Sequence, residues 1–254
     1  MPSGDPTQRF TDRVSAYARS RPSYPPELIR TLQAFAGLNA TATVADVGSG
    51  TGLLTRLLLP HCARVHAIEP NAAMRAEAER LGGEWPGFVS HDATAEATGL
   101  ANASIDLITA AQAFHWFEPA RTRHEFRRIL RADGQVALIW NDRQTDTTPF
   151  LAGYEGLLLR HGRNYSAISH SHIDHDRLTG FFGGASPVTR RIPYEQVLDY
   201  PGLEARLLSS SYVPNVGEPG YDAMLADLRE LFARHQVGGR VTLRYDTRVH
   251  YGRM

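Results

Sequence analysis

A short apolar run leads directly into three alternate glycines, and this feature most constrains the fold. The segment reads Val44-Ala-Asp-Val-Gly-Ser-Gly-Thr-Gly52, and a helix-like stretch follows it. A strand that enters a glycine-rich turn before a helix brings backbone N–H groups close to a ligand. In doubly wound folds such a turn lies at the carboxyl edge of the sheet, where ligands bind. The segment therefore predicts an α/β fold with a ligand site at residues 48–52.

Short runs rich in Val and Ile alternate with helix-like stretches along the first 141 residues, which favours a parallel sheet covered by helices. The first five strands are predicted at 43–47, 64–69, 87–91, 105–110 and 135–141, and the helices between them at 53–59, 72–81 and 118–130. Asn71 is a good N-cap and Gly82 a good C-cap for the helix they enclose. Beyond residue 141 we expect helices at 151–159, 202–211 and 221–235, and strands at 190–197 and 240–251. The last strand alternates apolar with polar residues, which is typical of an antiparallel strand.

The whole chain, residues 1–254, is predicted to form a single domain around a doubly wound, seven-stranded α/β sheet whose last strand is antiparallel. Residues 1–40 would form an N-terminal helical lid, and residues 41–142 the ligand-binding core. Residues 143–187 would form an insertion or cap after the fifth strand, and residues 188–254 the C-terminal strands and helices.

Composition excludes several kinds of chemistry. All 27 basic residues are arginine, so Schiff-base catalysis, pyridoxal phosphate attachment and a P-loop are excluded, because each needs a lysine. The formal charge is zero, which argues against a nucleic-acid partner. Cys62 is the single cysteine and no apolar run approaches membrane-spanning length. We expect a cytoplasmic protein with neither a nucleic-acid nor a membrane partner, as a monomer or homodimer.

Two carboxylates accompany the glycines, and their positions bear on the ligand. Glu69 ends the second strand, where an acid can accept both hydrogens of a ribose diol. Asp46 lies two residues before the first glycine, where it would be awkward beside a pyrophosphate but would suit a ligand with a positive amino group. The dinucleotide fingerprint G-x-G-x-x-G would need a glycine at position 53, which is Leu53. A nucleotide-dependent oxidoreductase is therefore the less favoured alternative.

In this segment the chain resembles the class I S-adenosylmethionine (SAM)-dependent methyltransferases, whose first motif is D-x-G-x-G-x-G. The resemblance continues in order through the segments at 69–74, 92–93, 105–116 and 130–135. The opening residues, with Arg9, Phe10, Tyr17 and Arg21, resemble the lid of a small-molecule subgroup that includes trans-aconitate methyltransferase-like proteins. The resemblance implies SAM as cofactor and S-adenosylhomocysteine (SAH) as product. The cofactor-binding residues it implies are Asp46, Gly48, Ser49, Gly50, Thr51 and Gly52 for the methionine end, Glu69 for the ribose, Pro70, Met74, Asp92 and Ala93 around the adenine, Ala111 and Gln112 near the methionine, and Tyr17 and Arg21 from the lid.

The candidate catalytic residue is His115, in the segment Phe114-His-Trp116, where the fourth strand ends. It would position the acceptor or take its proton, since histidine titrates near neutral pH; the alternative is an aromatic wall with a hydrogen-bonded histidine. The spacing of His170, His172 and His175 does not favour a metal site, so none is predicted. Arg190 and Arg191 could face an anionic acceptor, or could be solvated.

These observations predict methyl transfer from SAM to a small-molecule acceptor, for which a carboxylate is one candidate. A non-catalytic SAM-binding or regulatory module stays open as the alternative, because the cofactor motifs report binding and no residue of the acceptor pocket is compulsory for the chemistry.

Overall fold

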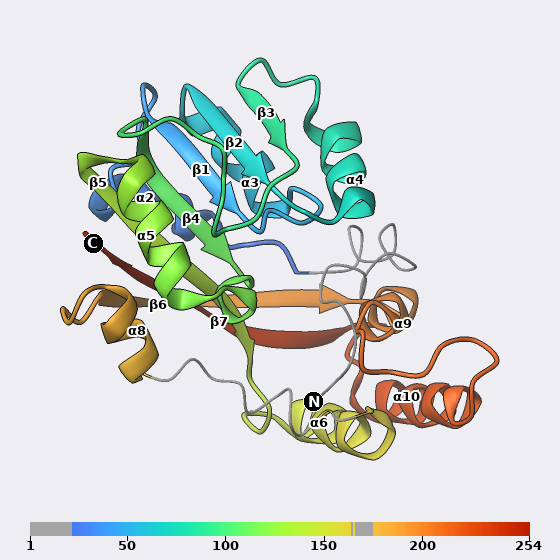
Figure 1. Cartoon of the computed structure of the whole chain (residues 1–254). Coiled ribbons are helices and arrows are strands. Elements are labelled where there is room, and N and C mark those ends of the chain that lie inside the picture. The colour runs from blue at the N-terminus through green and yellow to red at the C-terminus, as the bar shows by residue number, and fades with distance from the viewer. Residues whose placement is uncertain (1–21, 164, 166–174) are drawn as a thin grey trace.

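The computed structural model describes residues 22–163, 165 and 175–254. They form a seven-stranded sheet in the order β3-β2-β1-β4-β5-β7-β6 (Figure 1). Strands β1 to β5 are parallel, and β7 is antiparallel to both of its neighbours, β5 and β6. The predicted doubly wound sheet with an antiparallel last strand is thus confirmed. The strands are β1 (Thr43–Val47), β2 (Arg64–Ile68), β3 (Phe88–His91), β4 (Ile105–Ala111), β5 (Leu130–Arg143), β6 (Val188–Leu198) and β7 (Val241–Gly252).

The helices begin and end close to the predicted positions. Asn71 caps α4 as expected, because its side chain accepts the backbone N–H of Met74 at 2.9 Å. The helix runs through the predicted C-cap Gly82, and Gly83 takes that position. The helices are α2 (Pro26–Phe35), α3 (Leu53–Leu58), η3 (Leu59–His61), α4 (Ala72–Gly82), η4 (Phe114–Trp116), α5 (Pro119–Ile129), α6 (Pro149–His161), α8 (His175–Phe181), α9 (Tyr200–Leu208) and α10 (Tyr221–His235).

Strand β5 is longer than the sequence predicts. We expected a turn over residues 130–135 and a strand only from residue 135, but Leu130 already pairs with Ile105. Gln135 pairs with Leu107, so the residues between Leu130 and Gln135 form a bulge within the strand. At its other end β5 continues to Arg143, four residues past Ile139, which pairs with Ala111 at the end of β4. The long strand therefore extends beyond the carboxyl ends of its parallel neighbours.

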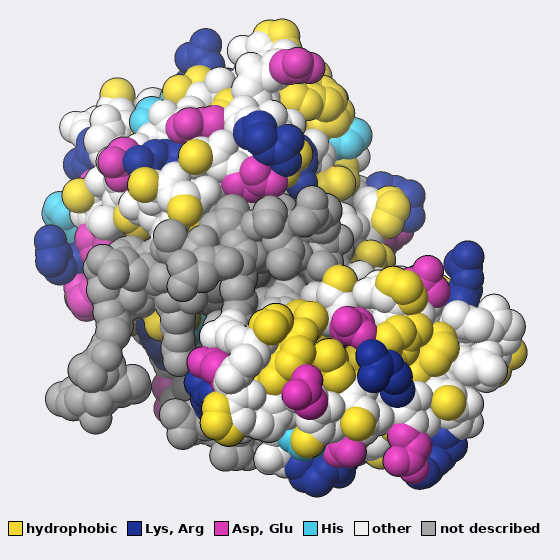
Figure 2. Space-filling model, turned by 90° about the vertical axis from the view of Figure 1, so that its right-hand side faces the viewer, with side chains coloured by type: hydrophobic (Ala, Val, Ile, Leu, Met, Phe, Trp, Pro, Cys, Tyr) yellow, Lys and Arg dark blue, Asp and Glu magenta, His cyan; other side chains and the backbone are white. Residues whose placement is uncertain are grey.

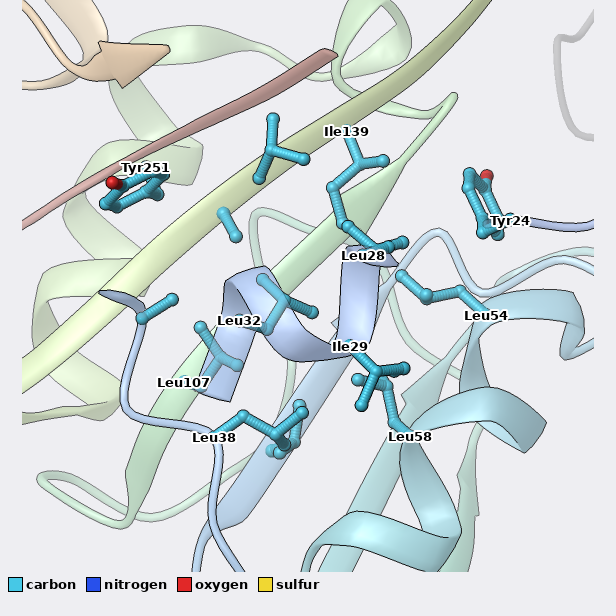
Figure 3. Close-up of a cluster of buried hydrophobic side chains, with 14 of the residues drawn as sticks. Tyr24, Leu28, Ile29, Leu32, Leu38, Leu54, Leu58, Leu107, Ile139 and Tyr251 are labelled. Carbon is cyan, nitrogen blue, oxygen red and sulfur yellow. The ribbon is translucent and has the colours of Figure 1, made fainter. Parts of the chain in front are cut away.

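Helices α2 and α3 cover one face of the sheet around the first hydrophobic cluster. Leu28 and Leu32 of α2 are fully buried against this face, near Leu107 of β4 and Ile139 of β5 (Figure 3). A second cluster on the opposite face joins α5 and α8 to the same central strands. Helix α2, within the predicted lid, is therefore a core element. The part of the lid before it, including Tyr17 and Arg21, lies outside the described residues.

The third hydrophobic cluster joins α6, α9 and α10 to the first half of β7. It lies on the same sheet face as the first cluster. Val249 and Tyr251 belong to the first cluster, and Leu243 and Tyr245 to the third. These four residues of β7 are separated by even numbers of residues, so their side chains point to the same face. In Figure 1 these helices gather beyond the carboxyl ends of β4 and β5. The sheet therefore supports two adjoining layers on one face.

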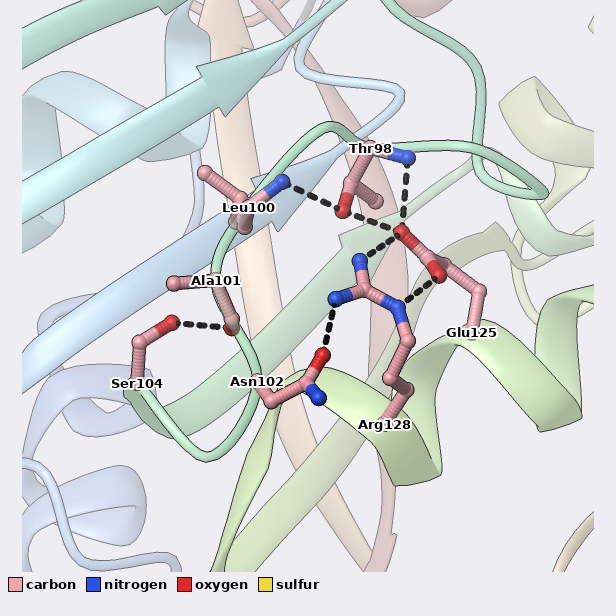
Figure 4. Close-up of polar contacts among 7 residues, drawn as sticks. All are labelled: Thr98, Leu100, Ala101, Asn102, Ser104, Glu125 and Arg128. Carbon is pink, nitrogen blue, oxygen red and sulfur yellow. Dashed lines mark hydrogen bonds and ion pairs between the residues drawn. The ribbon is translucent and has the colours of Figure 1, made fainter.

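Hydrogen bonds to Glu125, whose ion pair with Arg128 is partly buried, tie the loop before β4 to α5. Glu125 accepts the backbone N–H and the hydroxyl of Thr98 at 2.8 and 2.6 Å, and also pairs with Arg128 (Figure 4). Hydrogen bonding from Arg128 lowers the pKa of the Glu125 carboxyl to about 2. Arg128 in turn donates to Asn102 at 2.6 Å. The network holds the loop that follows the candidate adenine segment against the domain.

The surface carries charges of both signs. On the face that shows α4, α9 and α10, arginine side chains alternate with acidic ones among the described residues (Figure 2). No helix in the described part of the chain is long and apolar enough to cross a membrane.

Candidate cofactor and acceptor site

The turn between β1 and α3 needs glycine for both conformation and space. Gly48, Gly50 and Gly52 have φ angles of 69°, 56° and 74°, in the left-handed region that disfavours side chains. A Cβ at Gly48 would lie 2.5 Å from the Cβ of Ala113. The turn is anchored to β2, because Gly48 and Ser49 donate their N–H groups to the carbonyl oxygen of Ile68 at 2.8 and 3.1 Å.

The two hydroxyl residues of the turn hold unused polar atoms. The Ser49 and Thr51 hydroxyl oxygens are buried and have no hydrogen-bond partner among the described residues. Buried hydroxyls normally have a hydrogen-bond partner, so two hydroxyls without one in the same turn indicate that a polar ligand binds there. This observation fits the polar methionine end of SAM.

Asp46 lies beneath the turn, on β1, with only 1% of its surface exposed. Its two carboxylate oxygens accept the hydroxyls of Thr55 on α3 and Thr109 on β4, at 2.6 and 2.8 Å. Burial raises the pKa of the Asp46 carboxyl to about 6, against the opposing effect of these hydrogen bonds. Asp46 therefore joins three elements under the glycine turn, and in this conformation its oxygens are committed to protein hydroxyls.

Glu69 follows β2 and bridges to the same turn. Its Oε2 accepts the N–H of Gly50 at 2.9 Å and its Oε1 accepts the N–H of Asn71 at 2.8 Å. Burial raises the pKa of this carboxyl, and the two backbone donors and Arg75 oppose the rise. A carboxylate has about four acceptor positions, so two backbone bonds leave room for a diol. The predicted ribose contact is compatible with this geometry.

The adenine candidates come together around the start of α4. Met74 is buried, and its sulfur would lie 3.6 Å from a Cβ built on Gly50. Asp92 follows β3 and pairs with Arg75 at 3.0 Å, while 71% of its side chain stays exposed. Arg75 also donates to the carbonyl oxygen of Glu69 at 2.8 Å. Sequence reasoning missed Arg75, which links the ribose and adenine candidates. Pro70 and Ala93, next to Glu69 and Asp92, are half-buried.

Gln112 has strained backbone at the end of β4, directly after Ala111. Its φ angle is 55°, which is uncommon for a residue with a side chain. Two hydrogen bonds hold it, one from its N–H to Ile139 at 2.9 Å and one from its Nε2 to the carbonyl oxygen of Asn141 at 3.2 Å. Such outliers persist only where the surroundings determine them, and they gather at functional sites. Asn141 also donates to the carbonyl oxygen of Ser23, at the start of the described chain, at 3.1 Å.

His115 lies in η4, next to the glycine turn. Burial lowers its pKa to about 4, with a further contribution from Arg177, so the imidazole is neutral at pH 7. Arg177 of α8 lies over the ring of Phe114 at 5.1 Å and donates to the carbonyl oxygen of Phe117 at 3.2 Å. Since α8 belongs to the predicted insertion, this segment braces the turn that carries His115. No pattern in the sequence points to Arg177.

The remaining polar candidates are three histidines of the predicted insertion and two arginines of β6. His170 and His172 lie outside the described residues, and His175 begins α8. Within the described ranges, no group of three or more His, Cys, Asp or Glu side chains could hold a metal ion. Arg190 lies over the ring of Phe35 at 4.5 Å, and Arg191 pairs with Asp246. Both arginines are thus engaged within the protein.

Comparisons with known proteins agree with this geometry. A family model for a methyltransferase domain matches residues 45–138. An uncharacterized methyltransferase of Mycobacterium tuberculosis is 41% identical over 140 residues, which are 55% of this chain and 54% of the relative. An uncharacterized methyltransferase-like protein of Schizosaccharomyces pombe is 26% identical over 244 residues, 94% of this chain and 92% of the relative. A candidate type II methyltransferase structure from Anaeromyxobacter dehalogenans shares the fold with a TM-score of 0.69 at 24% identity, over 92% of this chain and 97% of that one.

The matched domain contains the glycine turn, the Asp46 and Glu69 carboxylates and the end of β4. Residues 45–138 are thus similar to a methyltransferase domain, and the mycobacterial relative that matches this chain is also described as a methyltransferase. The match spans about half the length of the mycobacterial relative. The resemblance to the trans-aconitate methyltransferase-like subgroup stays a prediction, since Tyr17 and Arg21 lie outside the described residues.

Proposed function

We propose that this protein transfers a methyl group from SAM to a small-molecule acceptor. The observation that carries the proposal is the turn at residues 48–52, which presents two buried, unpartnered hydroxyls and is held by Glu69. Ser49 and Thr51 would hydrogen-bond the methionine end of SAM, and Glu69 would accept the ribose hydroxyls. Met74, Asp92 and Ala93 would border the adenine, and Ala111 and Gln112 the methionine.

Bound SAM supplies an electrophilic methyl group on a sulfonium sulfur. The residues of this chain would align the acceptor with that group and exclude water, and alignment alone can contribute about 7–11 kcal/mol to lowering a barrier. Asp46 fixes the distance between β1, β4 and α3 beneath the turn through Thr55 and Thr109. It would act as a positioning residue, because its two oxygens are already engaged.

His115 is suited to orienting an acceptor. A general base works best when its pKa lies near the working pH, and a pKa of about 4 makes this imidazole a weak base at pH 7. A neutral imidazole can still donate one hydrogen bond and accept another. An acceptor that is already an anion, such as a carboxylate, needs no base, so a carboxylate acceptor is consistent with this site.

The alternative is a SAM-binding module without turnover. It keeps the same cofactor contacts, so only catalysis discriminates the two. The test is incubation of the purified full-length chain with methyl-labelled SAM and pools of small carboxylic acids, phenols and amines, with SAH release as the readout. We expect acceptor-dependent SAH release, reduced in a Glu69→Gln variant. Tight SAH binding without turnover across all pools would favour the binding module.

A further inference from the structure

Arg206 is a buried arginine whose hydrogen-bond partners are all neutral. It lies on α9 in the third cluster and is 7% exposed. Its Nε donates to the Tyr245 hydroxyl at 3.3 Å, and its Nη1 donates to the Ser209 and Ser210 hydroxyls at 3.4 and 3.3 Å. These distances are at the long end of the hydrogen-bond range. Among the described residues, no ion pair includes Arg206.

The neighbouring Arg143 is neutralised. Its guanidinium pairs with Glu155, donates to the Tyr165 hydroxyl at 3.0 Å, and lies over the Tyr154 ring at 5.0 Å. Tyr165 donates to the same Glu155 oxygen at 2.8 Å. Arg143 thus uses the charge of the acid on the adjoining helix α6, and leaves none for Arg206.

The tyrosines around these arginines do not supply a negative charge. Burial raises the pKa of Tyr154 and Tyr165 well above the usual value, so both hydroxyls stay neutral. Tyr154 lies close enough to feel both Arg143 and Arg206. Counted over the described residues, the cluster of Arg143, Glu155, Arg206 and their tyrosines therefore carries one excess positive charge. A buried charge without a counter-charge is costly, and a bound anion would remove that cost.

The excess charge lies beyond the end of β4, on the face that α2 covers. Tyr245, the partner of Arg206, pairs in the sheet with Arg143. Arg143 is four residues past Ile139, which pairs with Ala111, so it lies about 13 Å further along β5. In Figure 1, α6 and α9 lie beyond the carboxyl ends of β4 and β5, which is the direction in which an acceptor longer than a few atoms would extend from the cofactor.

We propose that Arg206 binds an anionic group, a carboxylate or a phosphate, at the end of the acceptor remote from the methylated atom. Arginine suits this role because its planar donors match both anions in pairs. Arg190 and Arg191 are engaged elsewhere, so Arg206 is the better anchor. The proposal rests on the proposed function, of which it names the acceptor class.

The test measures anion binding to the full-length chain in the presence of SAH. The probes are benzoate, tricarballylate and inorganic phosphate, titrated by calorimetry at constant ionic strength with sodium chloride as blank. The variants are Arg206→Gln, which removes the charge, and Arg206→Lys, which keeps it. Arg191→Gln is the matched control, an arginine of β6 whose own side chain is 64% exposed.

We expect at least one probe to bind the wild type and the Arg191→Gln variant alike, and to bind Arg206→Gln at least tenfold more weakly. Arg206→Lys should give an intermediate affinity, and it keeps the test open if Arg206→Gln does not fold. A carboxylate-only or phosphate-only response identifies the source of the anion. No probe binding to the wild type, or equal binding to Arg206→Gln, would overturn the proposal. SAH binding is measured in the same samples, so its absence would instead count against the proposed function.

Discussion

Asp46 should lower the stability of the fold at neutral pH, and this can be measured. The pKa of its buried carboxyl is raised from 3.8 to about 6, mainly by burial. Because the pKa in the folded chain is above that in the unfolded chain, protonation favours folding. The stabilising effect is complete below pH 3.8 and is lost as the pH rises to about 6. The difference corresponds to about 3 kcal/mol, since each pH unit is worth 1.36 kcal/mol.

The variant Asp46→Asn replaces the carboxylate with a neutral group of the same shape. We expect the variant to be more stable than the wild type by up to about 3 kcal/mol at pH 8, by about half as much at pH 5, and by a negligible amount near pH 3.5. Urea unfolding of both proteins across this range measures the free energy of unfolding. Asp133→Asn is the control, because the same substitution is made there at a side chain that is 88% exposed.

A variant that is less stable than the wild type at pH 8 would refute this reasoning. It would mean that the hydrogen bonds from Thr55 and Thr109 outweigh burial. A stability difference that is constant across the pH range would also refute it, since the cost depends on ionisation. If the prediction holds, Asp46 is retained at a cost in stability, as expected for a residue that positions a functional turn.

Three further substitutions test the site. Glu69→Gln should weaken SAH binding by about 1–3 kcal/mol in calorimetry, because a charged acceptor is lost, and an unchanged affinity would remove Glu69 from the ribose site. Gly48→Ala should lower the free energy of unfolding by about 2–5 kcal/mol, because the new Cβ clashes with Ala113 and φ is 69°. Gly99→Ala is the control, with φ 73° and open space, and should lower it by only about 1–2 kcal/mol. Equal losses would show that Gly48 is not closely packed. The stability of Gln112→Gly should stay within about 1 kcal/mol of the wild type, and Gln112→Val should lose more, because φ is 55° at this position. Thermal unfolding measures both variants, and the reverse order of stability would contradict the backbone strain.

The sequence predicts the parallel half of the sheet well because each strand is a short apolar run between strong helix and turn signals. Strand β1 coincides with the predicted residues 43–47, and α10 with 221–235. The extent of β5 was wrong, since the Asp133-Gly134 turn signal is absorbed as a bulge by pairing with β4. Local turn chemistry was overridden there by tertiary contacts.

The glycine turn and its carboxylates were predictable because they are contiguous with a strand end. What could not be predicted is which atoms already have partners. The hydroxyl of Thr109 reaches Asp46 from the neighbouring strand β4, and Arg75 of the preceding helix α4 reaches Asp92. Arg177 and Arg206 come from segments far along the chain, so their placement depends on packing that no local pattern encodes.

The most direct test of the account is calorimetric titration of the full-length protein with SAM and SAH, with NAD as the control ligand. We expect micromolar binding of both sulfur ligands and no binding of NAD. Binding of NAD without SAM or SAH would contradict it, because the turn at residues 48–52 would then serve a dinucleotide.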